Sequence, residues 1–413
     1  MLSPESSAEP GKWHTSRTPY LQDIMDAPND PEVETVVVMT SSQVGKTEDV
    51  LNTIGYFIHQ DPSPMLVIEP TLEIAEALSK DRIAPMFRDT DVLTTIIGDP
   101  KSKDGQHTLL HKKFPGGHLT LAGANSPAGL ASRPIRILLC DEVDRFPVSA
   151  GTEGDPLSLA SKRTTTFWNR KKIFVSTPTV KNLSRIEAAF EASDKRYFHI
   201  PCHECGKKQK LEWEYVRWED GKPETAIYVC RHCGAVWIDA QRNENIHLGE
   251  WIAEAPFKGV AGFHLNEMYN PWVSLADMAT RFLNAKHTLD RGDPEPMRVF
   301  VNTSLGRTWE EKAETADPEP LLARRENSTA EAVPYRVLYL TVGVDVQDDR
   351  LEAEIVGWRK DQSKDPEESW GIDDIILHGA PAKSQVWTEL DDILKKEFHT
   401  EDGRRLRIAA TAV

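Results

Sequence analysis

Two adjacent carboxylates at the end of an apolar run are the residues of this chain best placed to do chemistry. Ile137 to Cys140 are apolar without interruption, which predicts a strand buried on both faces, as in a parallel sheet. Asp141 and Glu142 follow, where the ligand crevice of such a sheet opens. Buried acids there are costly unless a cation or a polarised water uses them. ATP hydrolysis uses one acid for Mg²⁺ and one to activate water; the alternative is an ordinary acidic turn.

A second motif follows the β-branched run Val33 to Met39, which predicts another buried strand. The next residues are Thr40, Ser41, Ser42, Gln43, Val44, Gly45, Lys46 and Thr47. A helical pattern then begins, so the context is that of a phosphate-binding loop. Lys46 would reach the β- and γ-phosphates, Thr47 would bind Mg²⁺, and the backbone N–H groups of residues 41–47 would cradle phosphate oxygens. Thr40 stands where the usual pattern has glycine, so we expect a variant path, and a chance Gly-Lys-Thr is the alternative.

Strands and helices alternate over residues 33–180, with further strands expected at Met65–Glu69, Leu119–Ala122 and Ile173–Ser176. This alternation predicts an α/β fold with a parallel sheet. Two motifs on separate strands favour a P-loop NTPase of the RecA-like (ASCE) class, with helices on both faces of the sheet. The last strand ends in Ser176 and Thr177, whose hydroxyls could sense the γ-phosphate, although an ordinary turn is equally compatible.

Polar residues near the start of the chain could contact a flat ligand such as a nucleobase. Trp13, Tyr20 and Gln22 are the residues of this segment with suitable side chains.

Four cysteines have the spacing of a metal site. Cys202 and Cys205 form one Cys-x-x-Cys-Gly knuckle, and Cys230 and Cys233 form another. The glycine after each knuckle permits the tight turn that aims two thiolates at one ion. A zinc ribbon is expected, with a hairpin between the knuckles built from strands at 211–218 and 226–229. Disulfides or paired redox motifs are the alternatives, and a closed four-cysteine site would be structural rather than catalytic.

A new pattern opens at Tyr339. Residues 339–346 alternate as a strand, Asp348 and Asp349 form a turn, and Leu351 to Trp358 runs back as its partner. Asp345, an acid in the middle of the first strand opposite a glycine, fits a metal-binding carboxylate of an RNase H-like nuclease, where several carboxylates hold two metals. A surface aspartate is the alternative. The run from Leu406 to Val413 is expected to be a buried strand, after which the natural protein would continue.

The composition bounds the remaining possibilities. The net charge of −16 argues against wholesale coating of nucleic acid but not against a local basic channel. Basic residues cluster at 162–172 and 195–210. Neither a membrane span nor a secretion signal is expected. We expect a P-loop ATPase domain at 1–196, the zinc ribbon at 197–240, a linker or subdomain packing on the ATPase at 241–330, and the incomplete nuclease domain at 331–413.

Together these motifs resemble the large subunit of lambda-type tailed-phage terminases, from about Trp13 to Val413. The residues that carry the resemblance are 41–47, 139–147, 176–179, the ribbon cysteines, 262–266, 300–306 and 343–347. The resemblance implies an ATP-driven motor that pumps dsDNA into the procapsid and an endonuclease that cuts concatemers. It implies ATP with Mg²⁺ at Lys46, Thr47 and Asp141, water activation by Glu142, coupling by Ser176 and Thr177, and a nuclease Mg²⁺ or Mn²⁺ at Asp345.

The resemblance also implies partners and a place of action. These are dsDNA, the terminase small subunit, the portal protein of the procapsid and further copies in a ring, in the host cytoplasm and transiently at the portal. Ser42 stands where some terminases carry a catalytic arginine, and Arg133, Arg136 or Arg163, from the same chain or from a neighbouring subunit, could replace it. The next nuclease acid would lie just past residue 413, so weak ATPase activity as a monomer and no DNA cleavage are expected. The alternatives are a helicase-like or DNA-remodelling ATPase with a structural zinc module, and a non-catalytic DNA-binding scaffold.

Overall fold

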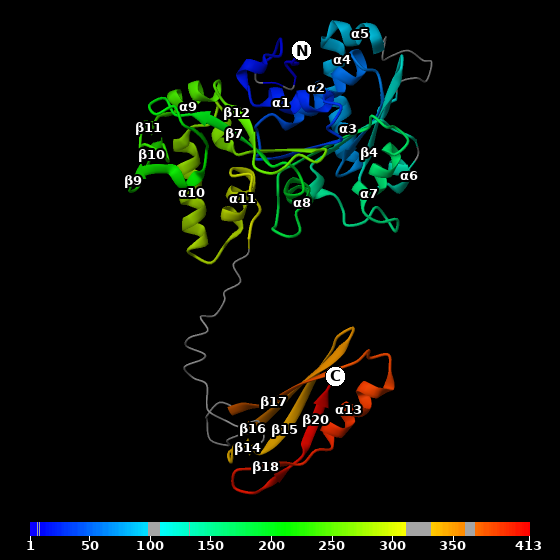
Figure 1. Ribbon diagram of the computed structural model, residues 1–413, viewed down its shortest axis with the longest axis vertical. Coiled ribbons are helices and arrows are strands. Elements are labelled where there is room, and N and C mark those ends of the chain that lie inside the picture. The colour runs from blue at the N-terminus through cyan, green and yellow to red at the C-terminus, as the bar shows by residue number, and fades with distance from the viewer. Residues whose placement is uncertain (6, 8, 98–107, 132, 311–331, 360–367) are drawn as a thin grey trace. The chain divides into compact units, whose positions relative to one another are not determined.

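The computed structural model describes residues 1–5, 7, 9–97, 108–131, 133–310, 332–359 and 368–413. The chain divides into two units, Met1–Glu311 and Lys312–Val413, and each is described by itself (Figure 1). The last residues of the linker or subdomain expected at 241–330, from 311 onward, lie outside the described residues. Of the helices described, none is long and apolar enough to cross a membrane.

A ten-stranded sheet organises the described part of the first unit. Its order is β12 (Glu250–Ala253), β7 (Arg196–Pro201), β13 (Val260–Leu265), β1 (Thr35–Thr40), β6 (Lys171–Ser176), β5 (Ile137–Asp141), β2 (Pro64–Glu69), β4 (Gly117–Gly123) and β3 (His111–Phe114), with β8 (Lys208–Lys210) paired to β7. Every pairing from β7 through to β4 is parallel. The expected parallel sheet is therefore confirmed, and its carboxyl ends share one edge.

The strand order sets the positions of the two motifs. The strand that precedes Glu142, β5, is not the immediate neighbour of β1, because β6 pairs with both. The segment expected to be a linker or subdomain contributes β13, which pairs with β1 along its whole length. Residues 260–265 therefore belong to the middle of this sheet.

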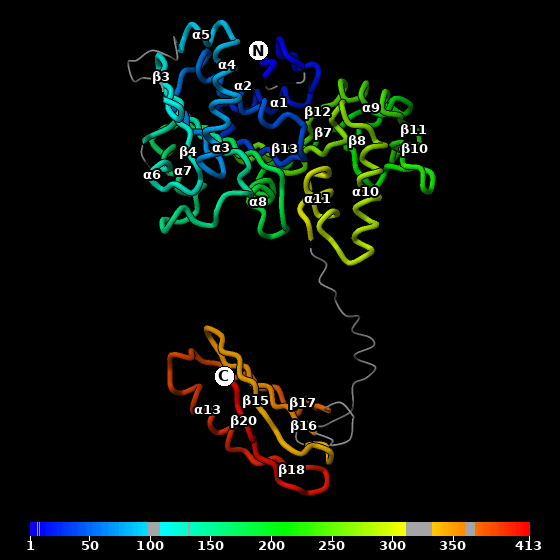
Figure 2. Tube along the Cα trace, turned by 180° about the vertical axis from the view of Figure 1, so that it is seen from behind, coloured from blue at the N-terminus to red at the C-terminus, as the bar shows by residue number. Residues whose placement is uncertain are grey.

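Helices cover both faces of the sheet because its strands are apolar on both sides. Val36 and Val38 belong to one hydrophobic core and Val37 and Met39 to another, as alternation along a strand requires. The first core includes α1 (Leu21–Asp26) and α2 (Lys46–His59), and the second includes α8 (Arg185–Glu191), which lies on the opposite side of the sheet (Figures 1 and 2). The other helices around the sheet are α3 (Leu72–Leu78), α4 (Ala84–Asp89), α5 (Asp91–Ile97), α6 (Pro127–Ala131) and α7 (Pro156–Ser161).

The four cysteines lie beside a small three-stranded sheet, at the side of the unit that also holds α9 and α10 (Figure 1). Its strands are β9 (Val216–Glu219), β10 (Lys222–Val229) and β11 (Val236–Trp237). The strand expected at 211–218 is wrong in its first half, where Trp213–Tyr215 form a 3-10 turn. Trp213 instead packs edge-on against Phe300. Around this sheet lie α9 (Asp239–Ile246), α10 (Leu275–Leu289) and α11 (Glu295–Thr303).

The second unit is built on a four-stranded sheet with the order β17 (Glu368–His378), β16 (Arg350–Arg359), β15 (Tyr339–Val346) and β20 (Ile408–Ala412). Strands β15 and β16 are antiparallel, as expected, and β20 runs parallel to β15. A smaller sheet of β14 (Ala332–Val333), β18 (Phe398–Thr400) and β19 (Arg405–Leu406), and the helix α13 (Ser384–Leu394), complete it.

Two details of this unit differ from the expectation. The final strand is not buried: residues 409–413 are exposed, because β20 is the edge of the sheet and has only β15 beside it. Asp345 is the seventh residue of the eight in β15, and the residue opposite it is the acid Glu352 rather than a glycine.

Candidate nucleotide site and four-cysteine cluster

The loop between β1 and α2 has the backbone conformation of a tight phosphate-binding turn. Gln43 and Gly45 have φ values of 59° and 100°, a region that favours glycine. A side chain at Gly45 would also collide with Leu21 of α1, since a Cβ there would lie 2.6 Å from Leu21 Cδ1. Helix α2 then begins at Lys46, so its first N–H groups have no partner within the helix. Such a helix start after a tight turn is able to hold an anion.

The side chains of three strand ends meet in this crevice. Lys46 Nζ lies 3.3 Å from Glu142 Oε1 and also donates to Thr177 Oγ1. Lys46 comes from the loop after β1, Thr177 from the end of β6 and Glu142 from the end of β5. The residues expected to bind phosphate, activate water and couple hydrolysis are thus brought together, with β6 between the other two strands.

The two acids differ in environment. Asp141 is 7% exposed, and its Oδ1 accepts the N–H of Glu142 at 2.9 Å. Burial and then the charge of Glu142 raise the pKa of Asp141, against the opposing effect of Lys46. Glu142 has φ 51°, and its Oε2 accepts no hydrogen bond in the described part of the chain. Arg145 Nε lies 3.7 Å from that oxygen.

Two further acids border the crevice, and the sequence analysis missed both. Glu69 ends β2 beside Asp141, and burial and the charges of Asp141 and Glu142 raise its pKa. Asp49, in α2, is 2% exposed, and burial followed by the charge of Asp141 raises its pKa to about 7. An available signal for Glu69 was its place at the end of an apolar run, the same signal that identified Asp141.

The N-terminal residues expected to contact a flat ligand are placed differently from one another. Tyr20 has no exposed surface and packs edge-on against Phe198, so the expectation for Tyr20 is wrong. Gln22 is exposed on α1, the helix whose Leu21 meets the phosphate loop. The indole of Trp13 is half-buried and donates to Thr15 Oγ1 at 3.0 Å.

The arginines suggested as catalytic are not in the crevice. Arg136 precedes β5, at the opposite edge of the sheet, where it bonds Asp61 and Ser63 at 2.8 and 2.7 Å. The carbonyl of Arg163 accepts the N–H of Ile135 at that same edge, and Arg133 lies 3.1 Å from His111 on β3. The arginine nearest to the acid pair is Arg145, whose side chain is 65% exposed.

Some residues of the two basic clusters are in ion pairs. Arg170 and Lys172 both pair with Glu34, at 2.8 and 2.7 Å. In the other cluster, ion pairs join Lys195 to Glu191, Arg196 to Asp194, Lys208 to Glu250 and Lys210 to Glu254. These residues therefore do not form an unpaired basic channel within one copy of the described chain.

The four cysteines form the single cluster of metal-ligating side chains found among the described residues, with all Sγ atoms within 4.8 Å of one another. Cys202 Sγ lies 3.8 Å from Cys233 Sγ, and Cys205 Sγ lies 3.9 Å from Cys230 Sγ. Four thiolates at about 2.3 Å from one zinc ion would be about 3.8 Å apart. Gly206 and Gly234 have φ values of 69° and 76°, as the expected knuckles require. The geometry therefore fits zinc.

Comparison with known proteins decides the family. A family model described as the phage terminase large subunit gpA, ATPase domain, matches residues 7–251, and one described as the terminase large subunit gpA, endonuclease domain, matches residues 260–413. The chain belongs to the gpA family of phage terminase large subunits. The endonuclease match begins at β13, a strand that the structure places in the sheet of the first unit.

Individual terminases agree with this assignment. The chain is 30% identical over 437 residues to the terminase large subunit of Enterobacteria phage P21 and 29% identical over 434 residues to that of Escherichia phage lambda. Both alignments cover 99% of this chain and 66% of the relative. The crystal structure of the HK97 bacteriophage large terminase aligns with a TM-score of 0.44 and 11% identity, covering 89% of this chain and 64% of that one.

Proposed function

We propose that this terminase chain hydrolyses ATP at the crevice of its first unit and uses the energy to translocate dsDNA into a procapsid. The observation that carries the proposal is the meeting of Lys46, Glu142 and Thr177. Three roles at a phosphate site, namely charge neutralisation, water activation and sensing, need these three residue types within reach of one phosphate. Family membership supports the same reading.

The residues present fit a magnesium ion beside the phosphates. Asp141 is a buried carboxylate, and Thr47, the second residue of α2, carries a hydroxyl; such oxygen ligands are those that Mg²⁺ prefers. A Mg²⁺ ion held by Asp141 and Thr47 would supply positive charge against the negative charge that develops on the phosphates. A cation would also offset the electrostatic repulsion among the carboxylates of Asp49, Glu69 and Asp141.

The chain's own residues have separate tasks in this proposal. Backbone N–H groups of residues 43–47 and the amine of Lys46 bind phosphate oxygens, with Gln22, Ser41 and Ser42 at the margin of the site. Glu142 uses Oε2, which accepts no hydrogen bond in the described part of the chain, to accept a proton from the attacking water. Thr177, now bonded to Lys46, and Ser176 register the presence of the γ-phosphate.

The coupling residues are connected to the end of the first unit. Thr179 accepts the N–H of Trp309 through its carbonyl at 2.8 Å, and Lys181 donates its own N–H to the carbonyl of Trp309 at 2.9 Å. A change at Thr177 would therefore be transmitted within four residues to the segment that precedes the second unit.

We propose further that the second unit contributes to a Mg²⁺- or Mn²⁺-dependent endonuclease in which Asp345 is one metal ligand. Asp345 is exposed, accepts a hydrogen bond from Gln347 and faces Glu352 across the sheet. It is not gathered with two other metal-ligating side chains in the described residues. Two-metal sites need several carboxylates, so these 413 residues alone are proposed not to cut DNA.

The remaining proposals follow from family membership. The four cysteines hold a structural zinc ion, and the partners are dsDNA, the terminase small subunit, the portal protein and further copies in a ring, in the host cytoplasm and at the procapsid. The experiment that tests the function is Mg²⁺-dependent ATP turnover with and without dsDNA, followed by DNA protection from nuclease in the presence of procapsids. Absence of nucleotide binding by the intact protein would overturn the proposal.

A further inference from the structure

Two segments that support the family assignment but have no assigned task, 262–266 and 300–306, meet at the phosphate loop. The N–H of Ser41 donates to the carbonyl of Leu265 at 2.9 Å, and the N–H of Ser42 donates to that of Thr303 at 2.8 Å. The approach at Gly306 is so close that a Cβ there would lie 2.8 Å from the nitrogen of Ser41. The first two N–H groups of the loop are therefore engaged, and the later ones remain for phosphate.

A side-chain amide holds the next peptide of the loop. Asn270 Nδ2 donates to the carbonyl of Gln43 at 2.9 Å, and Asn270 is 3% exposed. Its Oδ1 accepts the N–H of Trp272 at 2.9 Å, which fixes which end of the amide faces the loop.

The bond to Gln43 has a consequence for the following residue. In a trans peptide the C=O of one residue and the N–H of the next point in opposite directions. Fixing the carbonyl of Gln43 toward Asn270 therefore turns the N–H of Val44 away from Asn270. Gln43 has φ 59°, a conformation that costs a non-glycine residue energy and persists where its surroundings enforce it.

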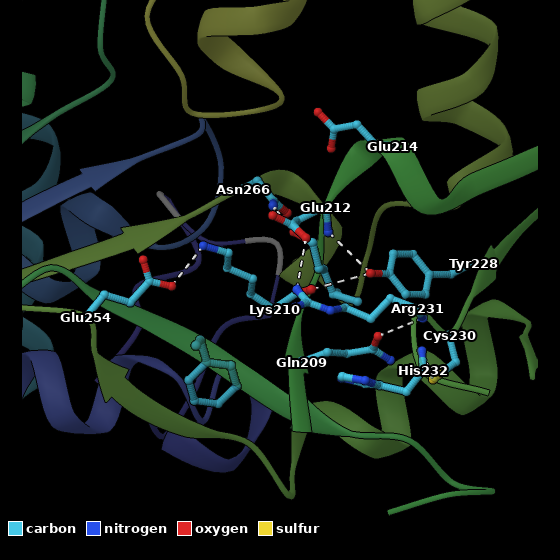
Figure 3. A network of polar contacts seen from close by, with 12 residues as sticks. Gln209, Lys210, Glu212, Glu214, Tyr228, Cys230, Arg231, His232, Glu254 and Asn266 are labelled. Atoms are coloured by element: carbon cyan, nitrogen blue, oxygen red, sulfur yellow. Dashed lines mark hydrogen bonds and ion pairs between the residues drawn. The ribbon is translucent and has the colours of Figure 1, made fainter. Parts of the chain in front are cut away.

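Two residues close to Asn270 in the sequence, Tyr269 and Asn266, bond the segment that leads into the four-cysteine ribbon. The hydroxyl of Tyr269 accepts the N–H of Leu211 at 2.8 Å, and Asn266 Nδ2 donates to the carbonyl of Leu211 at 2.7 Å. Two residues earlier, Gln209 Oε1 accepts the N–H of Arg231 at 3.0 Å, and Arg231 lies between two of the cysteines. Figure 3 shows Asn266, Gln209 and Arg231 along this route.

We propose that Asn270 is a positioning residue that orients the phosphate loop for nucleotide, and that the metal-bound ribbon holds Asn270 in place. The proposal rests on the proposed function, because it assumes that the loop binds phosphate. Backbone N–H groups contact a phosphate equally in the ground and transition states, so their misplacement weakens binding without slowing the bound enzyme. One hydrogen bond is worth about 1 kcal/mol, or about a fivefold change in affinity.

The first experiment compares Asn270→Ala and Asn270→Asp with the intact protein. Aspartate keeps the shape but cannot donate to the carbonyl of Gln43. Both variants are expected to raise the Kd for a fluorescent ATP analogue and the KM for ATP about fivefold or more, with kcat nearly unchanged. The matched control is Asn243→Ala, because Asn243 donates to the nearby carbonyl of Pro271 at 3.2 Å but has no bond to the loop.

The outcomes separate the two proposals. If the intact protein binds no nucleotide, the proposed function fails. If it binds nucleotide and Asn270→Asp binds equally well, the role of Asn270 is refuted, since packing alone then suffices. A variant that merely folds poorly would lower the active fraction, and hence kcat, while leaving KM unchanged.

The ribbon is tested by a double-mutant cycle. Removal of the metal with a chelator, followed by metal analysis, is expected to raise the Kd by a similar factor, and Asn270→Ala should then add little. Gln209→Met, which leaves the cysteines intact, is the substitute if the chelated protein unfolds. The anchoring role would be overturned if metal removal and Asn270→Ala weakened nucleotide binding additively. It would also be overturned if neither metal removal nor Gln209→Met changed the Kd.

Discussion

The amine of Lys46 lies 3.3 Å from a carboxylate oxygen of Glu142, although a whole strand separates the two strands that precede them. Without phosphate, the lysine neutralises the acid. Phosphate oxygens that attract the amine would release Glu142 to polarise water. We therefore expect binding of ATP and activation of the catalytic base to be one event in this terminase.

Replacement of Lys46 by alanine tests this pairing. Lys46→Ala removes the only side-chain amine that the described structure places against the acids, so ATP turnover should fall about 10²-fold or more. Turnover by a coupled phosphate-release assay is the measurement. A variant with near-normal turnover would show that another cation serves the phosphates.

Glu142→Gln separates binding from chemistry. The amide keeps the size of the side chain but cannot accept a proton, and general-base catalysis contributes about 10²–10⁴-fold. Hydrolysis should fall by that factor while the Kd for ATP stays within about threefold of the intact protein. Unchanged hydrolysis would transfer the role of base to another residue.

Asp144→Asn should loosen the segment 176–179, which contains the proposed coupling residues Ser176 and Thr177. Asp144 Oδ2 accepts the N–H and the hydroxyl of Thr179, both at 2.9 Å, and Oδ1 accepts the N–H of Ile186 at 2.8 Å. An amide would turn its NH₂ group toward one of these donors. The unfolding free energy, measured with urea, should drop by about 1.5–3 kcal/mol, and kcat should fall more than affinity.

A suitable comparison for that variant is Asp155→Asn. Asp155 accepts the N–H of Ser158 at 2.9 Å, caps α7 and pairs with Arg185 at 3.4 Å, but it has no hydrogen bond to Thr179. Its loss should cost about 1 kcal/mol of stability without a change in kcat. Equal effects on kcat would mean that Asp144 has no special connection to the site.

Acid should destabilise the first unit through His264. Its Nε2 lies 2.9 Å from the carbonyl of Gly306, and burial lowers its pKa from 6.5 to about 4. The unfolded chain therefore binds a proton at a higher pH than the folded chain. His264 should cost up to about 1.4 kcal/mol of stability per pH unit as the pH falls from about 6.5 toward about 4. The unfolding free energy of His264→Gln, measured with urea at several pH values, should fall less steeply with pH over that interval than that of the intact protein. An identical dependence on pH would contradict the role of His264.

Plasmid nicking in Mg²⁺ and in Mn²⁺ tests the second unit. Residues 1–413 should leave supercoiled DNA intact, because the residues that the structure describes do not gather with Asp345 the several carboxylates that two metals need. Nicking by the Asp345→Asn variant measures the activity of any contaminating nuclease. Cleavage by the intact chain that disappears in this variant would show that the site is complete.

Local patterns were sufficient to predict much of the fold. Uninterrupted apolar residues identified β1, β2 and β5, and Gly-Lys-Thr at a helix start placed Lys46 correctly. Each of these signals lies within about ten residues of sequence, where periodicity and capping preferences operate.

Pairings between distant segments could not be predicted in the same way. Nothing in Val260–Leu265 reveals that its partner is β1, because the residues that pair are specified by the completed sheet. The bond from Asn270 to Gln43 joins residues 227 positions apart. Tyr20 was misjudged since an aromatic side chain with a hydroxyl suits both a core and a binding surface.

The central place of β13 in the sheet also determines where the chain can be truncated to express the first unit alone. A gene truncated after residue 251, where the ATPase family match ends, would leave one side of β1 and of β7 without hydrogen-bond partners and invite aggregation. Such a fragment would also lose Asn270 and Thr303, and with them the hydrogen bonds to Gln43 and Ser42 that hold the phosphate loop. Excision at the junction of the two structural units, after Glu311, avoids both defects.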